Sequence, residues 1–399
     1  MVLPGIQVLI DERRDLLAGR RVGVYTNHTG VLPDLSSSLA ALRRLADVRA
    51  IFSPEHGLRG AAGEADGVAD GFDRSGTPIY SLYGAHPAPT PRQLAGLDAI
   101  VCDLQDIGCR YYTYAWTLAK VIEAAASAGI AVIVADRPNP IGGAVEGPGV
   151  EPRMRSLVGL HDVPIRHGLT IGELARLVDA ERRLGCGLTI VACRGWRRDM
   201  LWSAAGLPWV PTSPHMPAAE TALIYPGTCL LEGTNVSVGR GTAKPFEWLG
   251  APWIDGAALA ADLNRADLAG VRWRPVSFLP CAAPYAGELC EGVQPHVVDP
   301  AAFRPVAAGV ALLVALRRRF PEAFAISAAG GIYADRQRMT RRLYAAEAGE
   351  QTAHFDRLIG SSHLRDMVES AASPEEIMAD WPQYAEHFRA RVAPMLLYT

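Results

Sequence analysis

The first half of the chain repeats one pattern of hydrophobic and polar positions. A short run rich in β-branched residues ends in a polar loop containing glycine or proline, and a stretch with helical periodicity follows. This pattern predicts strands over residues 21–27, 48–53, 98–104, 131–137 and 188–193. It predicts helices near residues 35–46, 113–128 and 170–184.

The predicted strands are apolar on both faces and alternate with helices, which is typical of a mostly parallel, Rossmann-like sheet covered on both sides. Polar loops follow four of these strands, at residues 26–30, 53–57, 103–114 and 136–140. In an open α/β sheet, ligands bind outside the carboxyl ends of the strands. We therefore expect these four loops to converge on one ligand-binding edge.

The pattern changes after about residue 230. A loop rich in Gly, Thr and Asn covers residues 232–253 and leads into shorter elements: a helix near 256–266, a strand over 272–280, and helices over 306–319 and 374–392. A chain of 399 residues is also long for a single core. We expect a Rossmann-like domain over 1–231, a smaller α+β domain over 232–399, and a ligand cleft between them.

Composition narrows the class of protein. Hydrophobic residues make up 49% and charged residues 20%, and the net charge is −3. No stripe of Lys and Arg indicates nucleic acid or an anionic membrane as a partner. The chain shows no signal peptide and no membrane span, and its seven cysteines form no CxxC pair. These features favour a cytoplasmic protein with reduced thiols, with a Cys281–Cys290 disulfide as the alternative.

Several common signatures are missing from the sequence. There is no GxGxxG after the first strand, no P-loop, no HExxH and no GxSxG. Nucleotide-dependent enzymes, zinc proteases and serine hydrolases therefore lack their motifs here. We expect no cofactor and no bound metal.

The loops contain residues suited to acid–base chemistry and sugar binding. Glu55 and His56 follow an apolar strand and suit proton transfer, although a solvated surface loop is the alternative. Asp103 and Asp106 suit sugar hydroxyls or a metal. The tyrosines after them suit stacking on a pyranose ring, or else pack at the start of the next helix.

Other segments add candidates. Thr170 and Glu173 fit a capping box, which explains Glu173 without chemistry and leaves His167 as a candidate. Glu232 is a second carboxylate near the domain junction, where a simple hinge is the alternative. The candidate substrate-binding residues are Asn27, His28, Arg59, Asp103, Asp106, Arg110, Tyr111, Tyr112, Arg137, Asn139, Glu146, His167, Asn235 and Arg240.

Taken together, the motifs resemble one family. The chain contains, in this order, SPEHGLRG, IYSLYG, DLQDIGCRYYTY, DRPNP, VEGPGV, HGLTIGELA, SPHMPAAETALIYPGTCLLEGTN, GRGTAKPFEWLGAPW and FDRLIGS, and the resemblance runs from about residue 20 to the C-terminus. This series is similar to that of the exo-β-N-acetylmuramidase NamZ family. His215 departs from the pattern, since the family commonly has Asn there.

The resemblance implies a glycosidase that releases terminal N-acetylmuramic acid from the non-reducing end of peptidoglycan fragments. By motif, it makes Glu55 the general acid, with His56 and Asp106 as neighbours, and Glu232 the second carboxylate. Retaining, inverting and substrate-assisted mechanisms stay open, and in the last Asp103 or Asp106 would orient the acetamido group. The expected partner is a muropeptide or MurNAc-GlcNAc fragment, and the oligomeric state is left open.

Muramic acid carries a lactyl carboxylate, for which an arginine is the natural partner. Arg59, Arg110, Arg137 and Arg240 are the candidates, and we favour Arg110 or Arg240. Two other classes of function remain. One is a metal-dependent hydrolase with His28, His56, Asp103 and Asp136 as ligands. The other is a cell-wall-binding protein without catalysis.

Overall fold

The structure is a computed structural model that describes residues 1–63, 68–84, 86–326 and 352–399. Its first half contains a seven-stranded sheet with the order β3-β4-β2-β1-β5-β6-β7. All neighbouring strands are parallel except β3 and β4. The strands are β1 (Arg21–Thr26), β2 (Asp47–Ser53), β3 (Gly71–Phe72), β4 (Pro78–Ser81), β5 (Ala99–Asp103), β6 (Ala131–Ala135) and β7 (Leu188–Val191).

The five predicted strands are confirmed as β1, β2, β5, β6 and β7. The short strands β3 and β4 were not predicted, because four or fewer residues carry too little pattern to be told from a loop. Helices cover both faces of the sheet. They are α1 (Gly5–Glu12), α2 (Ser38–Leu42), α3 (Pro91–Leu94), α4 (Thr113–Ala128) and α5 (Ile171–Arg182).

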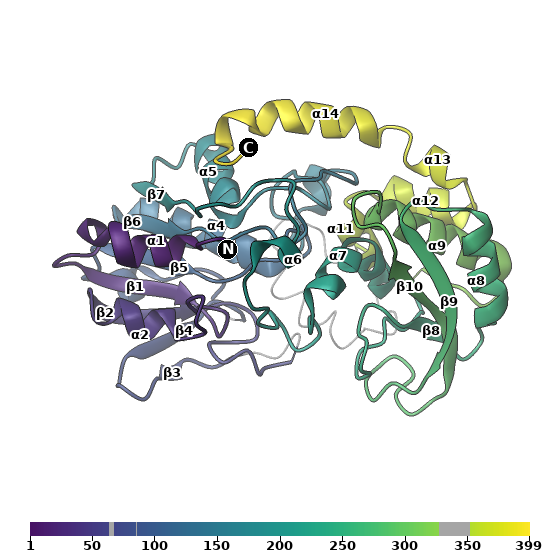
Figure 1. Ribbon diagram of the computed structural model, residues 1–399, viewed down its shortest axis with the longest axis horizontal. Coiled ribbons are helices and arrows are strands. Elements are labelled where there is room, and N and C mark those ends of the chain that lie inside the picture. The colour runs from purple at the N-terminus through teal and green to yellow at the C-terminus, as the bar shows by residue number, and fades with distance from the viewer. Residues whose placement is uncertain (64–67, 85, 327–351) are drawn as a thin grey trace.

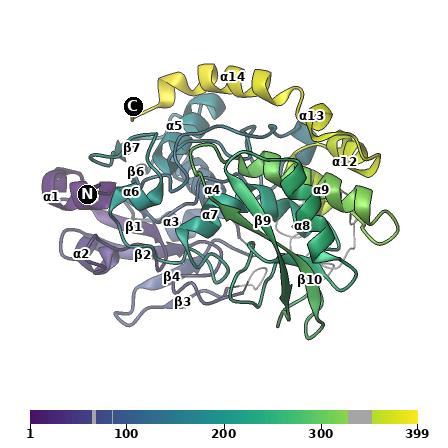
Figure 2. The ribbon, with the colours of Figure 1, turned by 45° about the vertical axis from the view of Figure 1, so that its right-hand side comes forward.

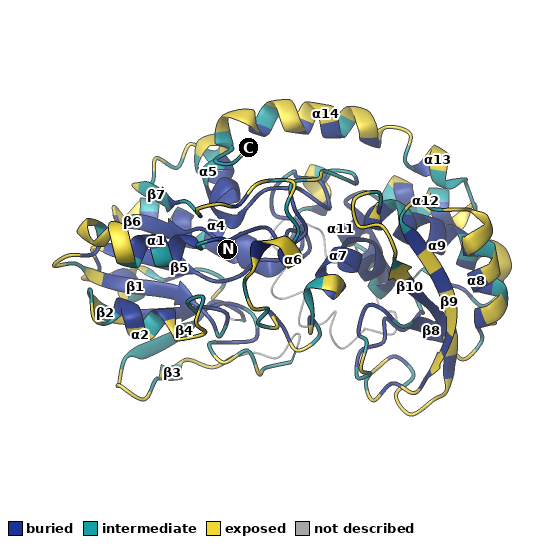
Figure 3. Cartoon of the chain, in the orientation of Figure 1, coloured by how far each residue is buried: buried dark blue, intermediate teal, exposed yellow. Residues whose placement is uncertain are grey.

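Alternate residues of the central strands explain this double layer. On β5, Ala99 and Val101 belong to the apolar cluster shared with α1 and α2, whereas Ile100 and Cys102 belong to the larger cluster shared with α4 and α5. Successive side chains of a strand point to opposite faces, so an all-apolar strand needs cover on both. Figure 3 accordingly shows β1, β5 and β6 as buried ribbons inside the layers.

The second half contains a three-stranded antiparallel sheet with the order β8-β10-β9. Figure 2 shows α8 and α9 beside β9 and β10 in the part of the molecule that faces the viewer. The elements are α6 (Trp202–Ala205), α7 (Ala219–Thr228), the 3-10 turn η3 (Cys229–Gly233), β8 (Leu249–Ala251), α8 (Gly256–Arg265), β9 (Val271–Phe278), β10 (Cys290–Val297), α9 (Pro305–Arg319), α11 (His354–Ile359), α12 (Ser362–Glu369), α13 (Pro374–Ile377) and α14 (Trp381–Val392).

The predicted helix over 374–392 is wrong as one element, because it is divided into α13 and α14. The Ser373 capping box starts α13, and Pro382 occupies the first turn of α14, where a proline starts a helix more easily than it continues one. Strand β10 was not predicted. It contains Gly292 and Pro295, which interrupt the strand pattern in the sequence.

The end of the chain returns to the first half of the molecule. Helix α14 passes over the top of the molecule in Figure 1 and brings the C-terminus close to α5. The Tyr398 hydroxyl donates to Asp136 Oδ2 at 2.6 Å and accepts from the Cys193 amide at 2.9 Å. The Leu397 amide donates to Glu173 Oε1 at 2.8 Å. The C-terminal segment therefore fastens the second half of the chain onto the first.

The predicted division at residues 231 and 232 remains a prediction. The seven-stranded sheet ends at Val191, and α7 already packs against α9, since a Cβ on Gly227 would lie 1.9 Å from the carbonyl oxygen of Pro305.

All seven cysteines are free, so the alternative of a Cys281–Cys290 disulfide is wrong. In the described ranges, no helix has the length and apolar character needed to cross a membrane.

Candidate active site

The polar loops of the first half meet at the carboxyl ends of the central strands. Strand β1 lies between β2 and β5, so the strand order reverses there, which is where α/β sheets bind ligands. The Thr26 hydroxyl donates to the carbonyl oxygen of Asp103 at 2.7 Å. The side-chain Nε2 of Gln105 donates to the carbonyl oxygen of Pro138 at 2.9 Å. These contacts confirm that the loops after β1, β5 and β6 converge.

The loop after β2 makes a tight turn that presents Glu55. The Gly57 amide donates to the Pro54 carbonyl at 3.0 Å, and His56 has a φ of 68°, a left-handed conformation that non-glycine residues rarely adopt. Such strain concentrates at functional sites. Glu55 is half-buried, and its Oε2 accepts a hydrogen bond of 2.7 Å from the Thr113 hydroxyl at the start of α4.

His28, from the loop after β1, packs directly against the Glu55 loop. A Cβ on Gly60 would lie 2.1 Å from an atom of the His28 ring, so only glycine allows this approach. The His28 Nε2 contacts the carbonyl oxygen of Pro211 at 2.6 Å, and burial lowers the pKa of His28. His56 turns inward instead, with Nδ1 at 2.8 Å from the Ala62 carbonyl oxygen. Both imidazoles therefore hold loops in place.

The carboxylates after β5 have different surroundings. Asp103 is fully buried and accepts from Arg137 Nε at 2.7 Å, so these two side chains neutralise one another. Asp106 accepts from the Gly108 amide at 2.8 Å through Oδ2, while its Oδ1 has no partner. Burial raises the pKa of Asp106 to about 7. The protonation of Asp106 therefore changes near neutral pH.

Buried polar atoms without a hydrogen-bond partner gather at this edge. Within the part of the chain that the structure describes, they include Asn27 Nδ2, His28 Nδ1, Ser53 Oγ, Asp103 Oδ2, Gln105 Oε1 and Asp106 Oδ1. Native proteins pair almost all buried polar groups, so a local cluster of exceptions indicates a functional site. Ser53 and Gln105 were not predicted as site residues, although both lie within the motifs that drew attention to their neighbours.

A second polar group contacts the loop formed by residues 207–216. Arg240 donates to Glu232 Oε1 through Nε at 2.8 Å and through Nη2 at 2.7 Å. Arg240 Nη1 also lies 2.9 Å from His215 Nδ1, so His215 contacts this ion pair. Glu232 and Arg240 were predicted as separate site residues, and the structure instead pairs them with each other.

Arg110 is a correction to the sequence-based expectation. Its side chain is fully buried, and its guanidinium donates to the carbonyl oxygens of Pro148, Gly149, Val163 and Leu358. A guanidinium enclosed by backbone carbonyls does not face a substrate carboxylate. Arg110 therefore connects α11 in the second half to loops of the first.

The tyrosines after β5 also have partners within the protein. The Tyr111 hydroxyl donates to the carbonyl oxygen of Pro226, and the Tyr112 hydroxyl donates to Thr212 Oγ1 at 2.6 Å. Both rings contact the ring of Tyr225 edge-on, which supports the alternative that they pack rather than stack on a sugar. Tyr112 nevertheless lies near the site. Burial raises the pKa of its phenol, and the nearby carboxyl groups of Glu55 and Asp106 raise it further.

Four further candidates hold the backbone. Asn139 donates to the Leu169 carbonyl and accepts from the Ile141 amide, and Asn235 makes an equivalent pair of bonds to Ala323 and Ala325. His167 Nδ1 accepts from the Leu169 amide, and burial lowers the pKa of this imidazole to about 3. Glu146 Oε1 accepts from the Ala307 amide in the first turn of α9. We therefore leave these four outside the proposed site.

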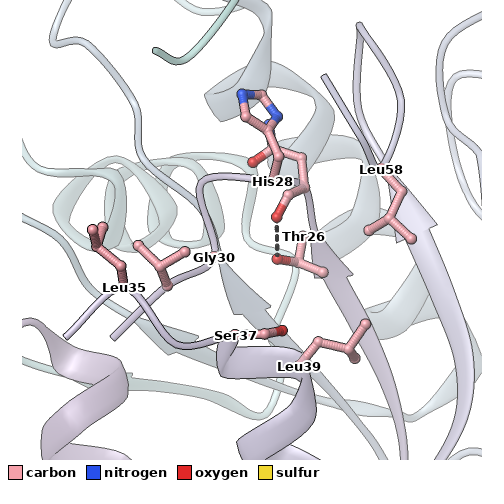
Figure 4. Close-up of a pocket in the computed structure, with 9 residues that line it drawn as sticks. Thr26, His28, Gly30, Leu35, Ser37, Leu39 and Leu58 are labelled. Carbon is pink, nitrogen blue, oxygen red and sulfur yellow. Dashed lines mark hydrogen bonds between the residues drawn. The ribbon is translucent and has the colours of Figure 1, made fainter. Parts of the chain in front are cut away.

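A cavity of about 330 Å³ lies at the end of β1, beside this group. Figure 4 shows Leu35 and Leu58 on opposite sides of it, with the imidazole of His28 pointing away from Ser37 and Leu39. The lining is neutral and largely apolar, and it does not include Glu55. The cavity is therefore a neighbouring space that the Glu55 side chain does not line.

The residues of the metal-dependent hypothesis do not assemble into a ligand set. His28 and His56 contact different carbonyls, Asp103 pairs with Arg137, and Asp136 accepts from the Thr170 hydroxyl at 2.7 Å. Across residues 1–63, 68–84, 86–326 and 352–399, no group of three or more His, Cys, Asp or Glu side chains is arranged to hold a metal ion.

Known proteins match this chain along almost its whole length. Family models of the N-terminal and C-terminal parts of exo-beta-N-acetylmuramidase NamZ match residues 22–220 and 223–398. The chain is 39% identical over 401 residues to peptidoglycan beta-N-acetylmuramidase NamZ of Bacillus subtilis (strain 168), covering 100% of this chain and 91% of that relative.

Two crystal structures of DUF1343 family proteins from Bacteroides fragilis NCTC 9343 are also similar. They superpose with TM-scores of 0.87 and 0.75 at 34% and 28% identity, and each comparison covers 100% of this chain and 99% of the other. The fold, the carboxylate-bearing loops and these matches define the class of protein as a glycoside hydrolase on a Rossmann-like sheet. The chain belongs to the exo-β-N-acetylmuramidase NamZ family.

Proposed function

We propose that the protein is an exo-acting β-N-acetylmuramidase that releases N-acetylmuramic acid from the non-reducing end of peptidoglycan fragments. The observation that carries this proposal is the full-length match to a curated peptidoglycan beta-N-acetylmuramidase. The site is compatible with it, because the loops at the switch point present a carboxyl group beside buried polar atoms without partners.

In this proposal Glu55 is the general acid. Among the carboxylates at the strand ends, Asp103 and Asp136 are fully buried and Asp106 is 6% exposed, whereas Glu55 is half-buried at the tip of its turn. Glu55 is therefore the most exposed of these four carboxyl groups. Its proton passes to the glycosidic oxygen as the bond to the sugar C1 breaks.

For the second half of the reaction we favour substrate assistance. Glu232 is held by Arg240, which contacts its Oε1 through both Nε and Nη2. Asp106 has an unpaired oxygen and lies with Glu55 near the phenol of Tyr112. We assign Asp106 to accept from the acetamido N–H of the sugar, so that the amide oxygen attacks C1. Water then opens the cyclic intermediate and returns a proton to Glu55.

One set of assays tests the proposed activity. A chromogenic β-N-acetylmuramic acid glycoside and its β-N-acetylglucosamine analogue are incubated with the protein, each with and without a chelator. We expect release of the chromophore from the muramic glycoside alone, with no effect of the chelator. Loss of turnover with chelator would support the metal-dependent alternative, and binding without release would support a cell-wall-binding protein.

Arg59 is our candidate for the lactyl carboxylate. Arg137 and Arg240 are paired with carboxylates and Arg110 is enclosed, whereas Arg59 is exposed and makes no hydrogen bond or ion pair within the described ranges. It also follows Glu55 in the same loop.

Replacing Arg59 by Ala is expected to lower kcat/KM for the muramic glycoside about tenfold, because one charge-assisted hydrogen bond is lost. Discrimination against the glucosamine analogue is measured in parallel and should shrink by the same factor. Arg92→Ala, an exposed arginine on α3, is the control and should leave both values unchanged. Unaltered discrimination in Arg59→Ala would refute this assignment.

A further inference from the structure

Thr113 holds the carboxyl group of Glu55. It is the first residue of α4, is 5% exposed, and donates from Oγ1 to Glu55 Oε2 at 2.7 Å. Within the described ranges, this is the side-chain hydrogen bond that Glu55 makes. The bond joins two segments 58 positions apart in the chain, so the sheet and α4 together determine where the carboxyl group lies.

The neighbouring hydroxyls are not available for this task. The Tyr112 hydroxyl donates to Thr212 Oγ1, and the Tyr114 hydroxyl donates to the carbonyl oxygen of Thr212. Both phenols are buried, and burial raises their pKa values, so both stay neutral beside Glu55. The two tyrosines thus bind the loop that contains Thr212. Thr113, which lies between them in the sequence, contacts the carboxyl group of Glu55 instead.

The helix start adds to the effect of the hydroxyl. Helix α4 has 16 residues, and its N-cap residue Tyr112 makes no side-chain capping bond. The first turn of a helix has amides without intrahelical partners and a positive end of the helix dipole. The Glu55 carboxyl group, bonded to the first residue of α4, therefore lies at this end of the helix.

We propose that Thr113 is a positioning residue that determines which oxygen of Glu55 carries the catalytic proton. This inference rests on the proposed function of Glu55 as the general acid. Because Oε2 accepts from the Thr113 hydroxyl, the proton resides on Oε1, the oxygen left to face the glycosidic bond. After transfer, the same hydroxyl stabilises the carboxylate until water restores the proton.

The test compares Thr113→Val, which keeps the branched shape and removes the donor, with Thr113→Ser, which keeps the donor. We expect Thr113→Val to lower kcat for a muramyl disaccharide tenfold to a hundredfold with little change in KM, on the order of one lost charge-assisted hydrogen bond. Thr113→Ser should restore most of the rate. Thr117→Val, buried one turn further along α4, is the matched control and should keep the wild-type kcat.

The pH profile separates positioning from a loss of packing. Removal of a hydrogen-bond donor to a carboxyl group disfavours the ionised form, so the alkaline limb of kcat/KM should move upward in Thr113→Val. The other titratable groups near Glu55 are the phenols of Tyr112 and Tyr114, His56 on its own turn, His28 packed against that loop, and Asp106 beside Tyr112. The phenols ionise far above this range, and the substitution at residue 113 replaces none of the other three groups.

The outcomes for the two proposals are distinguishable. If Glu55→Gln is inactive while Thr113→Val keeps the wild-type rate and pH profile, the function of Glu55 stands and the role of Thr113 is wrong. If Glu55→Gln keeps its activity, the proposed general acid is wrong and the positioning role falls with it. If Thr113→Val and Thr113→Ser lose activity equally with an unmoved pH profile, the hydroxyl does not position the proton.

Discussion

Replacing Glu55 by Gln is expected to lower the rate of hydrolysis of a muramyl disaccharide by about 10²- to 10⁴-fold, the usual contribution of a general acid. The glutamine keeps the side-chain shape and can still accept from the Thr113 hydroxyl, so the turn after β2 should keep its conformation. Steady-state kinetics with the disaccharide and a thermal unfolding curve of the variant are the measurements.

The leaving group sharpens this test. A nitrophenolate leaves without a proton, so the loss in Glu55→Gln should be much smaller for a nitrophenyl glycoside than for a sugar leaving group. Glu220→Gln, at an exposed position on α7, is the matched control and should keep wild-type kinetics with both substrates. An equal loss with the two substrates would mean that Glu55 does not act as the proton donor.

Replacing Arg110 by Met is expected to destabilise the fold by about 4 kcal/mol, because four backbone carbonyls lose a buried donor at roughly 1 kcal/mol each. The methionine keeps part of the apolar stem but supplies no donor. The fully buried position leaves little room for water to replace the lost bonds. Urea denaturation, followed by fluorescence and by activity, measures the loss.

Arg153→Ala is the control for Arg110→Met. Arg153 lies near the same loops and pairs with Glu151, but its side chain is 66% exposed, so its loss should change stability by less than about 0.5 kcal/mol. If Arg110→Met instead unfolds like the wild type and loses only its preference for muramic glycosides, the original sequence-based role of Arg110 as a carboxylate ligand would be restored.

Strong local patterns explain why much of the fold was predictable. Residues 99–102 and 131–135 are apolar throughout, which requires burial on both faces, and the Thr170 capping box predicts the start of α5. The elements that were missed carry weak local signals. Strand β10 contains a glycine and a proline and depends on its pairing with β9, which sequence periodicity does not reveal.

The candidate site was predictable in its location but not in the roles of its charged residues. Motif order and the rule for strand ends placed Glu55 and Asp106 at the ligand-binding edge. Arg110 and Arg240 have the same chemistry in the sequence, yet one is enclosed by carbonyls and the other is paired with Glu232. A partner contributed by a distant segment leaves no trace in the local pattern around an arginine.

The sequence by itself determined the parallel sheet, the converging loops and the family, because these follow from hydrophobic periodicity and from motifs that are local in the chain. Only the tertiary structure decided which polar side chains form hydrogen bonds and ion pairs with other parts of the protein. The bond between Thr113 and Glu55 and the enclosure of Arg110 by Leu358 both join residues far apart in sequence. Such contacts depend on how strands, helices and the returning C-terminal segment pack, and that packing assigns each charge its partner.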